Sequence, residues 1–525
     1  MPSTSAPRRT PRPGAITPVI ALAGVVVSLM QTLVVPIIPE LPRLLHAAPS
    51  DTSWVITATL LAAAVVTPIA GRLGDMYGKR RILVASLAAL VAGSVVCAVT
   101  DSLVPVIVGR ALQGLATGVI PVGISMLRDE LPPARVGGAV SLVSATLGVG
   151  GAIGLPVAAA IVEYADWHVL FWLAAALGVV CLALVVALLP ESPVRAPGRF
   201  DVPGALGLAA GLVCLLLPVT KGGDWGWTSA ATLWLFAAGA LVLVVWGFHE
   251  TRVAQPLVDL RITVRRPVLF TNLASVLVGF AMYAMSLTLP QLLQSPAATG
   301  YGLGQSTLAA GLALAPGGLV MMALSPVSAR ITARSGARTA LLVGVAVLGV
   351  GYGIGLLLMS EVWQIVLASM IISAGVGIAY AAMPALIMGA VPVTETASAN
   401  GVNALMRSIG TSTSSAVTAA ILANMTTRLG PAEIPTEHGF RMTYVVAMAA
   451  AAVGLLLTLA IPGGGVRRPG GGAEAPAPVP ASTSAPAPAP ASTSAPEGEG
   501  TSAPEGTSVT ATEDRHTRTR KGNAP

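Results

Sequence analysis

The chain has 525 residues, of which 54% are hydrophobic and only 10% are charged, whereas a soluble domain has about 25% charged residues. This composition excludes a soluble protein. A membrane helix needs about 20 apolar residues, so the chain has enough for on the order of 14 spans. We therefore expect an all-α polytopic membrane protein. Its net charge of +7 then reports on orientation in the bilayer rather than on binding of nucleic acid.

Apolar runs long enough to cross a bilayer follow one another from residue 16 to residue 462. The predicted spans are 16–38, 53–71, 82–100, 103–126, 138–161, 168–189, 203–219, 230–248, 268–290, 305–328, 339–358, 362–388, 398–423 and 440–462. An even number of spans puts both termini on one side. Of the Lys and Arg residues near span ends, 20 fall on that side and four on the other. Because cytoplasmic loops carry the excess of basic residues, we expect cytoplasmic termini and a place in the cell membrane.

The connection between the second and third spans reads G-R-L-G-D-M-Y-G-K-R-R from residue 71. Its glycines permit a tight turn, and Asp75 can sit at a helix N-terminus, where the dipole and free N–H groups favour a carboxylate. The run resembles the signature loop of the major facilitator superfamily, which also lies between the second and third helices. The matching residues are Gly71, Leu73, Asp75, Gly78, Lys79 and Arg80.

A degraded copy of this loop lies between spans ten and eleven. It retains Arg330, Gly336 and Arg338, but Ala333 stands where the first copy has its acid. Two related halves would leave such a trace. The predicted domains are a cytoplasmic tail at 1–15, a six-helix bundle at 16–190, an inserted helix pair with flanking loops at 191–267, a second six-helix bundle at 268–462 and a disordered cytoplasmic tail at 463–525. The last is rich in Pro, Ala, Ser and Thr and buries too little apolar surface to fold.

Further segments resemble the fourteen-helix branch of the superfamily, whose members are mostly drug:proton antiporters. The segments are R-A-L-Q-G from Arg110, W-H-V-L-F-W from Trp167 and N-A-L-M-R-S-I-G from Asn403. The resemblance implies a major facilitator fold with 14 transmembrane helices arranged 6 + 2 + 6. It also implies a monomer in the lipid bilayer that works by alternating access on small-molecule substrates and protons.

Span five resembles the antiporter motif of the fifth helix at Gly150, Gly154 and Pro156. Small residues let helices approach closely, and proline bends a helix. Leu155 separates Gly154 from Pro156, whereas the family has glycine and proline adjacent. The alternative is a glycine-rich packing seam with no role in coupling.

Two arginines, Arg110 and Arg407, are predicted inside the membrane, where a charged side chain costs about 2.5 to 3.5 kcal/mol. No acid lies near a span centre, and Met30 holds the place where the branch commonly has an Asp. The carboxylates that remain for proton coupling stand at outer span ends, where they could also simply face water. They are Glu40, Asp51 and Glu163.

For the substrate cavity we expect polar and aromatic residues of the span interiors. These are Gln31, Gln113, Tyr283, Gln291, Tyr380, Asn400 and Asn403. Gln31 and Arg110 both lie about 10 Å deep at 1.5 Å per residue, so we expect the amide oxygen of Gln31 to accept from Arg110. Two buried cations without an acid favour an acidic or zwitterionic substrate. The alternative is that both arginines are scaffolding, bonded to carbonyls and to amides such as those of Gln113 and Asn403.

Motifs of other function classes are missing from the sequence. The three cysteines have no C-x-x-C spacing and the five histidines no H-E-x-x-H spacing, so we expect no metal site, no cofactor and no enzyme. Lys79 lacks the spacing of a nucleotide-binding loop, which excludes an ATP-driven pump. We expect proton-coupled efflux of drugs, antibiotics or other amphipathic molecules. The alternative is a proton-independent or importing transporter of a small organic anion or metabolite.

Overall fold

The computed structural model describes residues 13–196, 198–429 and 432–462, and almost all of these are helical. They belong to one compact unit, residues 1–466. The predicted C-terminal tail, and all but the last three residues of the predicted N-terminal tail, lie outside the described residues.

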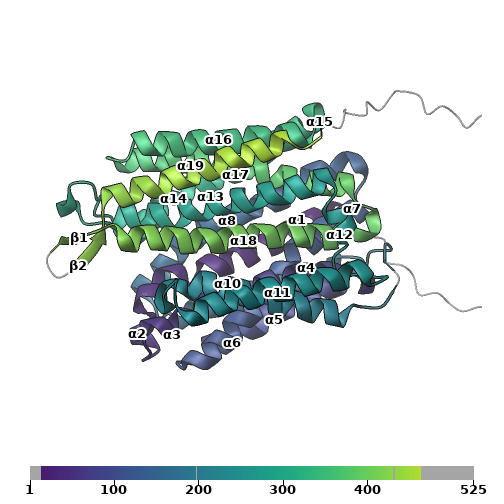
Figure 1. Ribbon diagram of the computed structural model, residues 1–525, viewed down its shortest axis with the longest axis horizontal. Coiled ribbons are helices and arrows are strands. Elements are labelled where there is room, and N and C mark those ends of the chain that lie inside the picture. The colour runs from purple at the N-terminus through teal and green to yellow at the C-terminus, as the bar shows by residue number, and fades with distance from the viewer. Residues whose placement is uncertain (1–12, 197, 430–431, 463–525) are drawn as a thin grey trace, which may run out of the picture. The chain divides into compact units, whose positions relative to one another are not determined.

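Thirteen spans within the described residues are long and apolar enough to cross a membrane, and the long helices run side by side (Figure 1). The fourteenth expected span, 398–423, coincides with α18 (Thr396–Asn424), which has 29 residues but is rich in Ser, Thr and Asn. This helix packs against α4, α7, α10 and α13, so protein rather than lipid covers much of its polar surface. The fold is all-α and polytopic, and the count of fourteen spans stays a prediction.

The first half contains the six predicted spans. Its elements are α1 (Pro13–Thr32), η1 (Val35–Glu40), α2 (Leu41–Leu44), α3 (Pro49–Thr52), α4 (Trp54–Tyr77), α5 (Lys79–Ala98), α6 (Leu103–Gly114), η2 (Leu115–Gly118), α7 (Val119–Glu130), α8 (Pro133–Tyr164) and α9 (His168–Leu188). Predicted span four is interrupted by the tighter turn η2. Gly114, at the start of this turn, lies so close to α4 that a Cβ atom would meet the Thr59 carbonyl oxygen.

The inserted segment forms a helical hairpin. Its elements are α10 (Val202–Trp225), α11 (Ala230–Arg252) and the short α12 (Leu260–Thr263). Helix α10 packs against α4 of the first half and α18 of the second, whereas α11 is exposed along most of its length. Lys221 of α10 is buried, and its ammonium group donates to the Ser50 carbonyl oxygen and to the Ser53 hydroxyl. The hairpin is therefore fixed to the first half through this lysine.

The second half contains the remaining helices and a hairpin that the sequence did not predict. Its elements are α13 (Arg266–Gln294), η3 (Ala297–Thr299), α14 (Thr307–Ala323), α15 (Ser325–Ser335), α16 (Ala337–Leu357), α17 (Val362–Ala390), η4 (Val393–Glu395), α18, β1 (Thr426–Leu429), β2 (Ala432–Pro435) and α19 (Glu437–Leu459). The two strands pair antiparallel between α18 and α19.

The buried apolar side chains form separate cores in the two halves. One core contains residues from α1 to α9, together with Met388 of α17. Another runs from Ala274 on α13 to Ile461 after α19. A smaller cluster joins α4, α10 and α18 through residues such as Leu61, Leu208 and Leu405. Each half therefore has its own core, and the inserted hairpin covers a place where the halves meet.

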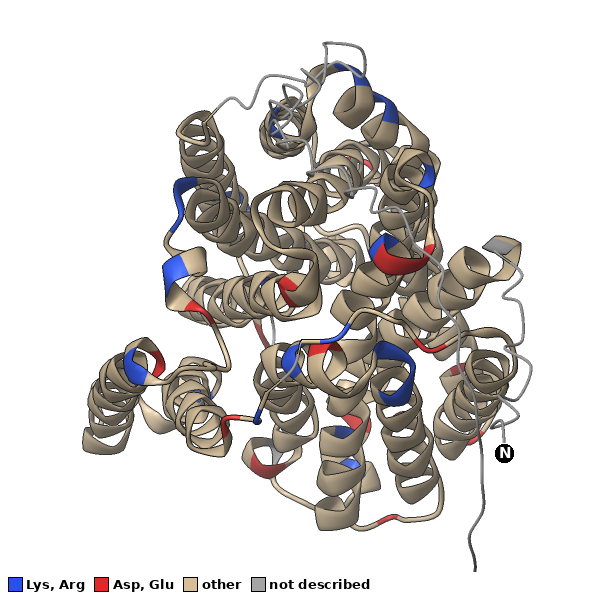
Figure 2. Ribbon diagram, turned by 90° about the vertical axis from the view of Figure 1, so that its right-hand side faces the viewer, with Lys and Arg blue, Asp and Glu red and all other residues tan. Residues whose placement is uncertain are grey.

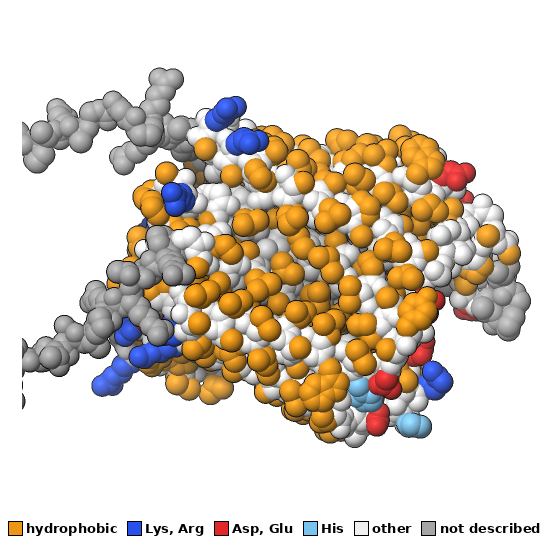
Figure 3. Space-filling view, turned by 180° about the vertical axis from the view of Figure 1, so that it is seen from behind, with side chains coloured by type: hydrophobic (Ala, Val, Ile, Leu, Met, Phe, Trp, Pro, Cys, Tyr) orange, Lys and Arg blue, Asp and Glu red, His pale blue; other side chains and the backbone are white. Residues whose placement is uncertain are grey.

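Charged side chains are divided between the two ends of the helices. A broad hydrophobic belt separates an end with Lys and Arg from an end with acids and His (Figure 3). Figure 2 looks onto the first of these ends. We call it the basic end; it comprises residues 72–81, 128–135, 252–266 and 330–338. The opposite end, which carries β1 and β2, is called the far end (Figure 1).

Candidate functional site

At the basic end, Asp75 joins the two halves. Its side chain in the last turn of α4 is fully buried and accepts from the backbone N–H groups of Ala397 (3.3 Å) and Ser398 (2.8 Å). These are the first free N–H groups of α18, where the helix dipole favours an anion. Gly71 allows this approach, because a Cβ atom there would overlap the Ala397 carbonyl oxygen. The helix N-terminus foreseen for Asp75 is thus that of α18 in the second half.

A buried charge network supports this contact from within the first half. The Lys79 ammonium lies 3.6 Å from an oxygen of Asp75 and forms an ion pair with Asp129 at the end of α7. The Ser192 hydroxyl also donates to Asp129. Sequence reasoning missed Asp129 and Ser192. Its only available signal for Asp129 was an acid beside Arg128 at the basic end of span four.

A second contact between the halves lies close to the first. The guanidinium of Arg128 on α7 donates to the Thr396 hydroxyl (2.6 Å) and to the Val391 carbonyl oxygen (3.4 Å). Val391 directly follows α17, and Thr396 is the first residue of α18. The basic end is therefore closed by contacts that combine α4 and α7 of the first half with the start of α18.

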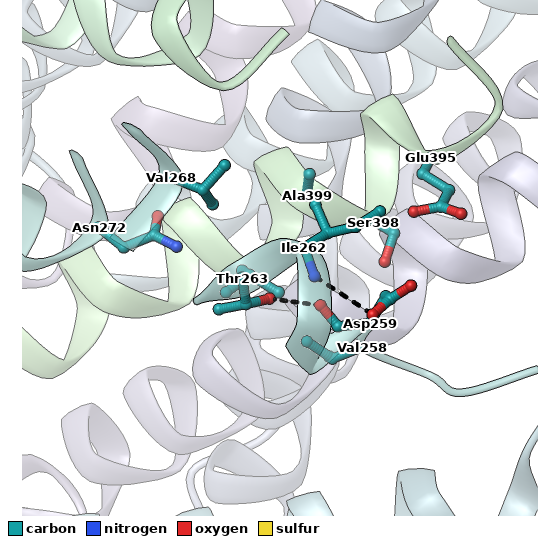
Figure 4. A pocket seen from close by; sticks show the side chains of 10 residues that line it. Val258, Asp259, Ile262, Thr263, Val268, Asn272, Glu395, Ser398 and Ala399 are labelled. Atoms are coloured by element: carbon teal, nitrogen blue, oxygen red, sulfur yellow. Dashed lines mark hydrogen bonds between the residues drawn. The ribbon is translucent and has the colours of Figure 1, made fainter. Parts of the chain in front are cut away.

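Two small cavities border this closure. The larger, of about 250 Å³, is lined by Arg72, Glu395, Ser398 and the loop after α11. Figure 4 shows the smaller one, of about 20 Å³, where Asp259 caps the short helix α12 beside Ser398 and Glu395. Burial raises the pKa of Glu395, and nearby Asp259 acts in the same direction while Arg72 opposes it. Sequence reasoning singled out neither cavity.

Arg110 is enclosed by partners of the first half. Its Nη1 donates to Gln113 Oε1 (2.7 Å) and to the Met30 carbonyl oxygen (3.3 Å), and its Nε donates to the Val55 carbonyl oxygen (3.3 Å). The expected bond from Arg110 to Gln31 was wrong: the side chain of Gln31 is exposed. Gln113 accepts from Arg110 instead, because it lies one turn further along the same helix, where residues three apart are neighbours.

Gln113 was expected in the substrate cavity, but both the oxygen and the nitrogen of its amide are hydrogen-bonded within this network. It is 4% exposed, accepts from Arg110 and donates to the Ser94 hydroxyl (2.8 Å). Each buried polar group of the network therefore satisfies another. For Arg110 the scaffolding interpretation holds.

Arg407 has a different environment near the middle of α18. Its Nη1 donates to Asn403 Oδ1 (2.7 Å), and its guanidinium lies 5.2 Å from the ring centre of Tyr380 on α17. Asn403 in turn donates to Asn272 Oδ1 (2.9 Å) and Ser275 Oγ (2.7 Å) on α13. The structure thus brings together three residues predicted from sequence, Tyr380, Asn403 and Arg407, and adds two that were missed.

The remaining residues predicted for the cavity lie elsewhere. Asn400 is buried and donates to the Thr396 carbonyl oxygen near the basic end. Tyr283 is half-buried on α13, and Gln291 is exposed on the last turn of that helix. No contact with Arg407 joins these three within the described residues, so their part in substrate binding stays a prediction.

Helix α8 lies between α1 of its own half and α14 of the other half. A Cβ atom on Gly150 would overlap Ser28, and one on Gly154 would overlap Thr32, so these two glycines face α1. Pro156 faces the second half, where Gly311 lies against its backbone nitrogen. The predicted motif therefore serves two interfaces, and its role in coupling stays a prediction.

The candidate proton-coupling acids face water at the far end. Glu40 pairs with Arg43 at 3.2 Å in an exposed ion pair, and Asp51 and Glu163 are exposed. Exposed pairs of this kind contribute about 0 to 1 kcal/mol. Nothing in these contacts distinguishes one acid as the proton carrier.

Helices of this number and hydropathy define a multi-pass membrane protein. The family model of the Major Facilitator Superfamily matches residues 20–415 and, in a second match, residues 273–495. The chain therefore belongs to this superfamily, whose members transport small molecules across membranes.

Three relatives illustrate the similarity. The tetracenomycin C resistance and export protein of Streptomyces glaucescens is 28% identical over 63% of this chain and 61% of the relative. The multidrug resistance protein 3 of Bacillus subtilis is 25% identical over 68% of this chain and 70% of the relative. The probable actinorhodin transporter of Streptomyces coelicolor is 30% identical over 68% of this chain and 63% of the relative. The first and third matches thus span less than two thirds of the relatives' length.

Solved structures share the fold. The human organic anion transporter MFSD10 (TETRAN) matches 86% of this chain and 100% of its own, with a TM-score of 0.61 and 15% identity. The proton:xylose symporter XylE, bound to 6-bromo-6-deoxy-D-glucose, matches 86% of this chain and 96% of its own, with a TM-score of 0.61 and 13% identity. At this level of identity the likeness concerns the fold alone.

Proposed function

We propose that this protein exports drugs, antibiotics or other amphipathic small molecules from the cytoplasm by proton-coupled alternating access. The names of the relatives, which speak of resistance and export, support efflux. The excess of Lys and Arg supports a cytoplasmic basic end in the cell membrane. The observation that carries the mechanism is the contact of Asp75 with the N–H groups of Ala397 and Ser398, because it closes one end between the halves.

In this proposal the structure represents the state with its cytoplasmic end closed. Opening that end requires Asp75 to leave the start of α18 and Arg128 to leave Thr396. The small residues at the boundary between α8 and α14 permit the halves to move against each other, because close packing there involves few bulky side chains. Glu40, Asp51 and Glu163 remain the proposed proton carriers, and the protein is proposed to work as a monomer.

Transport of rhodamine B into inverted membrane vesicles tests the proposal. An acidic vesicle interior should drive accumulation of the dye, and a protonophore should abolish it. Accumulation that is indifferent to the proton gradient would support a proton-independent transporter, and movement out of the vesicles would support an importer. Either outcome contradicts the proposal.

Asp75→Asn tests the closing contact in the same vesicles. The neutral side chain loses hydrogen bonds to a charged group, each worth about 1.5 to 3 kcal/mol, so the cytoplasmic end should close less completely. We expect transport to fall about tenfold, since 1.4 kcal/mol is a factor of ten. The amount of folded protein, measured by size-exclusion chromatography, should be unchanged. Wild-type transport by this variant would contradict the role of the contact.

A further inference from the structure

Arg407 makes fewer hydrogen bonds than Arg110, which makes three. Within the described residues, one hydrogen bond reaches the Arg407 guanidinium group, from Nη1 to Asn403. The side chain is half-buried, whereas that of Arg110 is 3% exposed. A guanidinium group has five N–H donors in a planar fork, so most of the donors of Arg407 have no hydrogen-bond partner among the described residues.

The guanidinium group of Arg407 lies on the inner side of α18. Met406 and Ile409 on the same helix pack against the apolar cluster that α4 and α10 form. Arg407 turns the other way, toward Tyr380 on α17, and α17 itself contacts α8 of the first half. The guanidinium group therefore faces the region where the halves meet rather than lipid.

Hydrogen bonds of Asn403 fix the position of the Arg407 side chain. Asn403 Nδ2 donates to both Asn272 and Ser275 on α13, which directs its Oδ1 toward the arginine. Tyr380 is 4% exposed, and the guanidinium carbon of Arg407 lies 5.2 Å from the centre of its ring. Such a supporting shell keeps the free donors in place without satisfying them.

No acid compensates this cation at membrane depth. Among the described membrane helices, the acidic residues lie in the first or last turn, as Asp75, Glu163 and Glu250 do. An arginine remains protonated in proteins, and an unpaired charge is costly inside a membrane. A negatively charged ligand would remove this cost while it is bound.

We propose that Arg407, positioned by Asn403 and Tyr380, binds the carboxylate of amphipathic organic acids. A carboxylate matches the guanidinium fork with two parallel hydrogen bonds. This inference rests on the proposed function, because it names the chemical class of molecule that the transporter carries. It predicts that the protein binds an organic acid more tightly than the ester of the same acid, because the two molecules differ mainly in the negative charge.

Rhodamine B and its ethyl ester provide this pair of probes. Their binding to the purified full-length protein in detergent can be measured by fluorescence polarisation, which requires no transport. We expect the wild type to bind rhodamine B about tenfold more tightly than the ester, because one charge-assisted bidentate contact is worth about 1.4 kcal/mol or more. Arg407→Gln should remove this preference and leave ester affinity within about twofold. Arg407→Lys, which keeps the charge but loses the fork, should retain part of it.

Arg334→Gln is the matched control, since it removes the same charge from an exposed site at the basic end. It should bind both dyes as the wild type does. Equal affinity of the wild type for the two dyes, or no binding of either, would overturn the inference. An equal loss of both affinities in Arg407→Gln would also overturn it, because that result indicates a structural role. A failure of proton-driven transport alone would contradict the proposed function and leave the binding result intact.

Discussion

The buried arginines of the two halves show how the same residue type serves different purposes. Arg110 in the first half is surrounded by Gln113 and two backbone carbonyl oxygens. Arg407 in the second half has Asn403 and the face of Tyr380, and its other donors have no hydrogen-bond partner among the described residues. Protein groups thus compensate the charge of Arg110 inside the membrane, whereas the charge of Arg407 is left for a ligand to compensate.

The signature loop and its copy show a related difference. Asp75 caps α18, whose first turn offers the N–H groups of Ala397 and Ser398. The copy forms the end of α15 and the turn after it, and α15 packs against α8. Helix α8 starts at Pro133, which has no N–H group, and the Arg135 N–H group is already bonded to a backbone carbonyl oxygen. This helix start therefore offers fewer free donors to a carboxylate. The loss of the acid at Ala333 matches this poorer supply of donors.

The largest expected effect distinguishes the two arginines by stability. Arg110→Met removes the donor to the Gln113 amide oxygen and to two buried backbone carbonyl oxygens. Each lost hydrogen bond to a charged group costs about 1.5 to 3 kcal/mol. We expect Tm to fall by roughly 5 °C or more in a thermal size-exclusion assay. Arg407→Met should change Tm much less. Equal shifts would refute the contrast between an enclosed and an open arginine.

The next prediction concerns the two loops. Introducing an acid into the copy by Ala333→Asp should not restore transport to Asp75→Asn, because the start of α8 has fewer free N–H groups than the start of α18. Dye accumulation in inverted vesicles should stay about tenfold below the wild type. Recovery of transport in the double variant would show that the loops are interchangeable.

A smaller effect is expected where the inserted hairpin meets the first half. Lys221→Met removes the donor to Ser50 and Ser53, which should cost about 1.5 to 3 kcal/mol. Ser53→Ala removes one acceptor and should cost about 1 kcal/mol. Tm in detergent measures both. If Lys221→Met left Tm unchanged, the hairpin would be held by its apolar contacts alone.

The smallest effect compares the start of α9 with the start of α19, the last helix of each half. Asp166 accepts from the His168 N–H group, and Thr436 accepts from the Gly439 N–H group. Replacing either residue by Ala should cost about 1 kcal/mol. The bonds from the His168 backbone and side chain lower the pKa of Asp166 below 3.8.

These helix starts should differ in pH dependence. A lowered pKa means that the ionised Asp166 stabilises the fold fully above about pH 3.8 and loses this effect as the pH falls through the lowered value. The difference in Tm between the wild type and Asp166→Ala should therefore shrink in acid. The difference for Thr436→Ala should not, because a hydroxyl group does not titrate in this range. Parallel behaviour of both variants would contradict this assignment.

Hydropathy was enough to predict the membrane class and the positions of most helices, and the resemblance of the signature loop predicted the family. The sequence also placed Arg110 and Arg407 within the helices and suggested a helix N-terminus as the partner of Asp75, without naming that helix. These properties depend on the side chains of one short segment at a time, so they can be read along the chain.

Only the tertiary structure decided which groups meet. The N–H donors that Asp75 contacts lie 322 residues further along the chain, and the structure decided between Gln31 and Gln113 as the partner of Arg110. The β-hairpin and the partners of Lys79 also escaped prediction. A hydrogen bond requires two atoms within about 3 Å, and that distance depends on the packing of whole helices. Apolar character, in contrast, belongs to each residue wherever it lies.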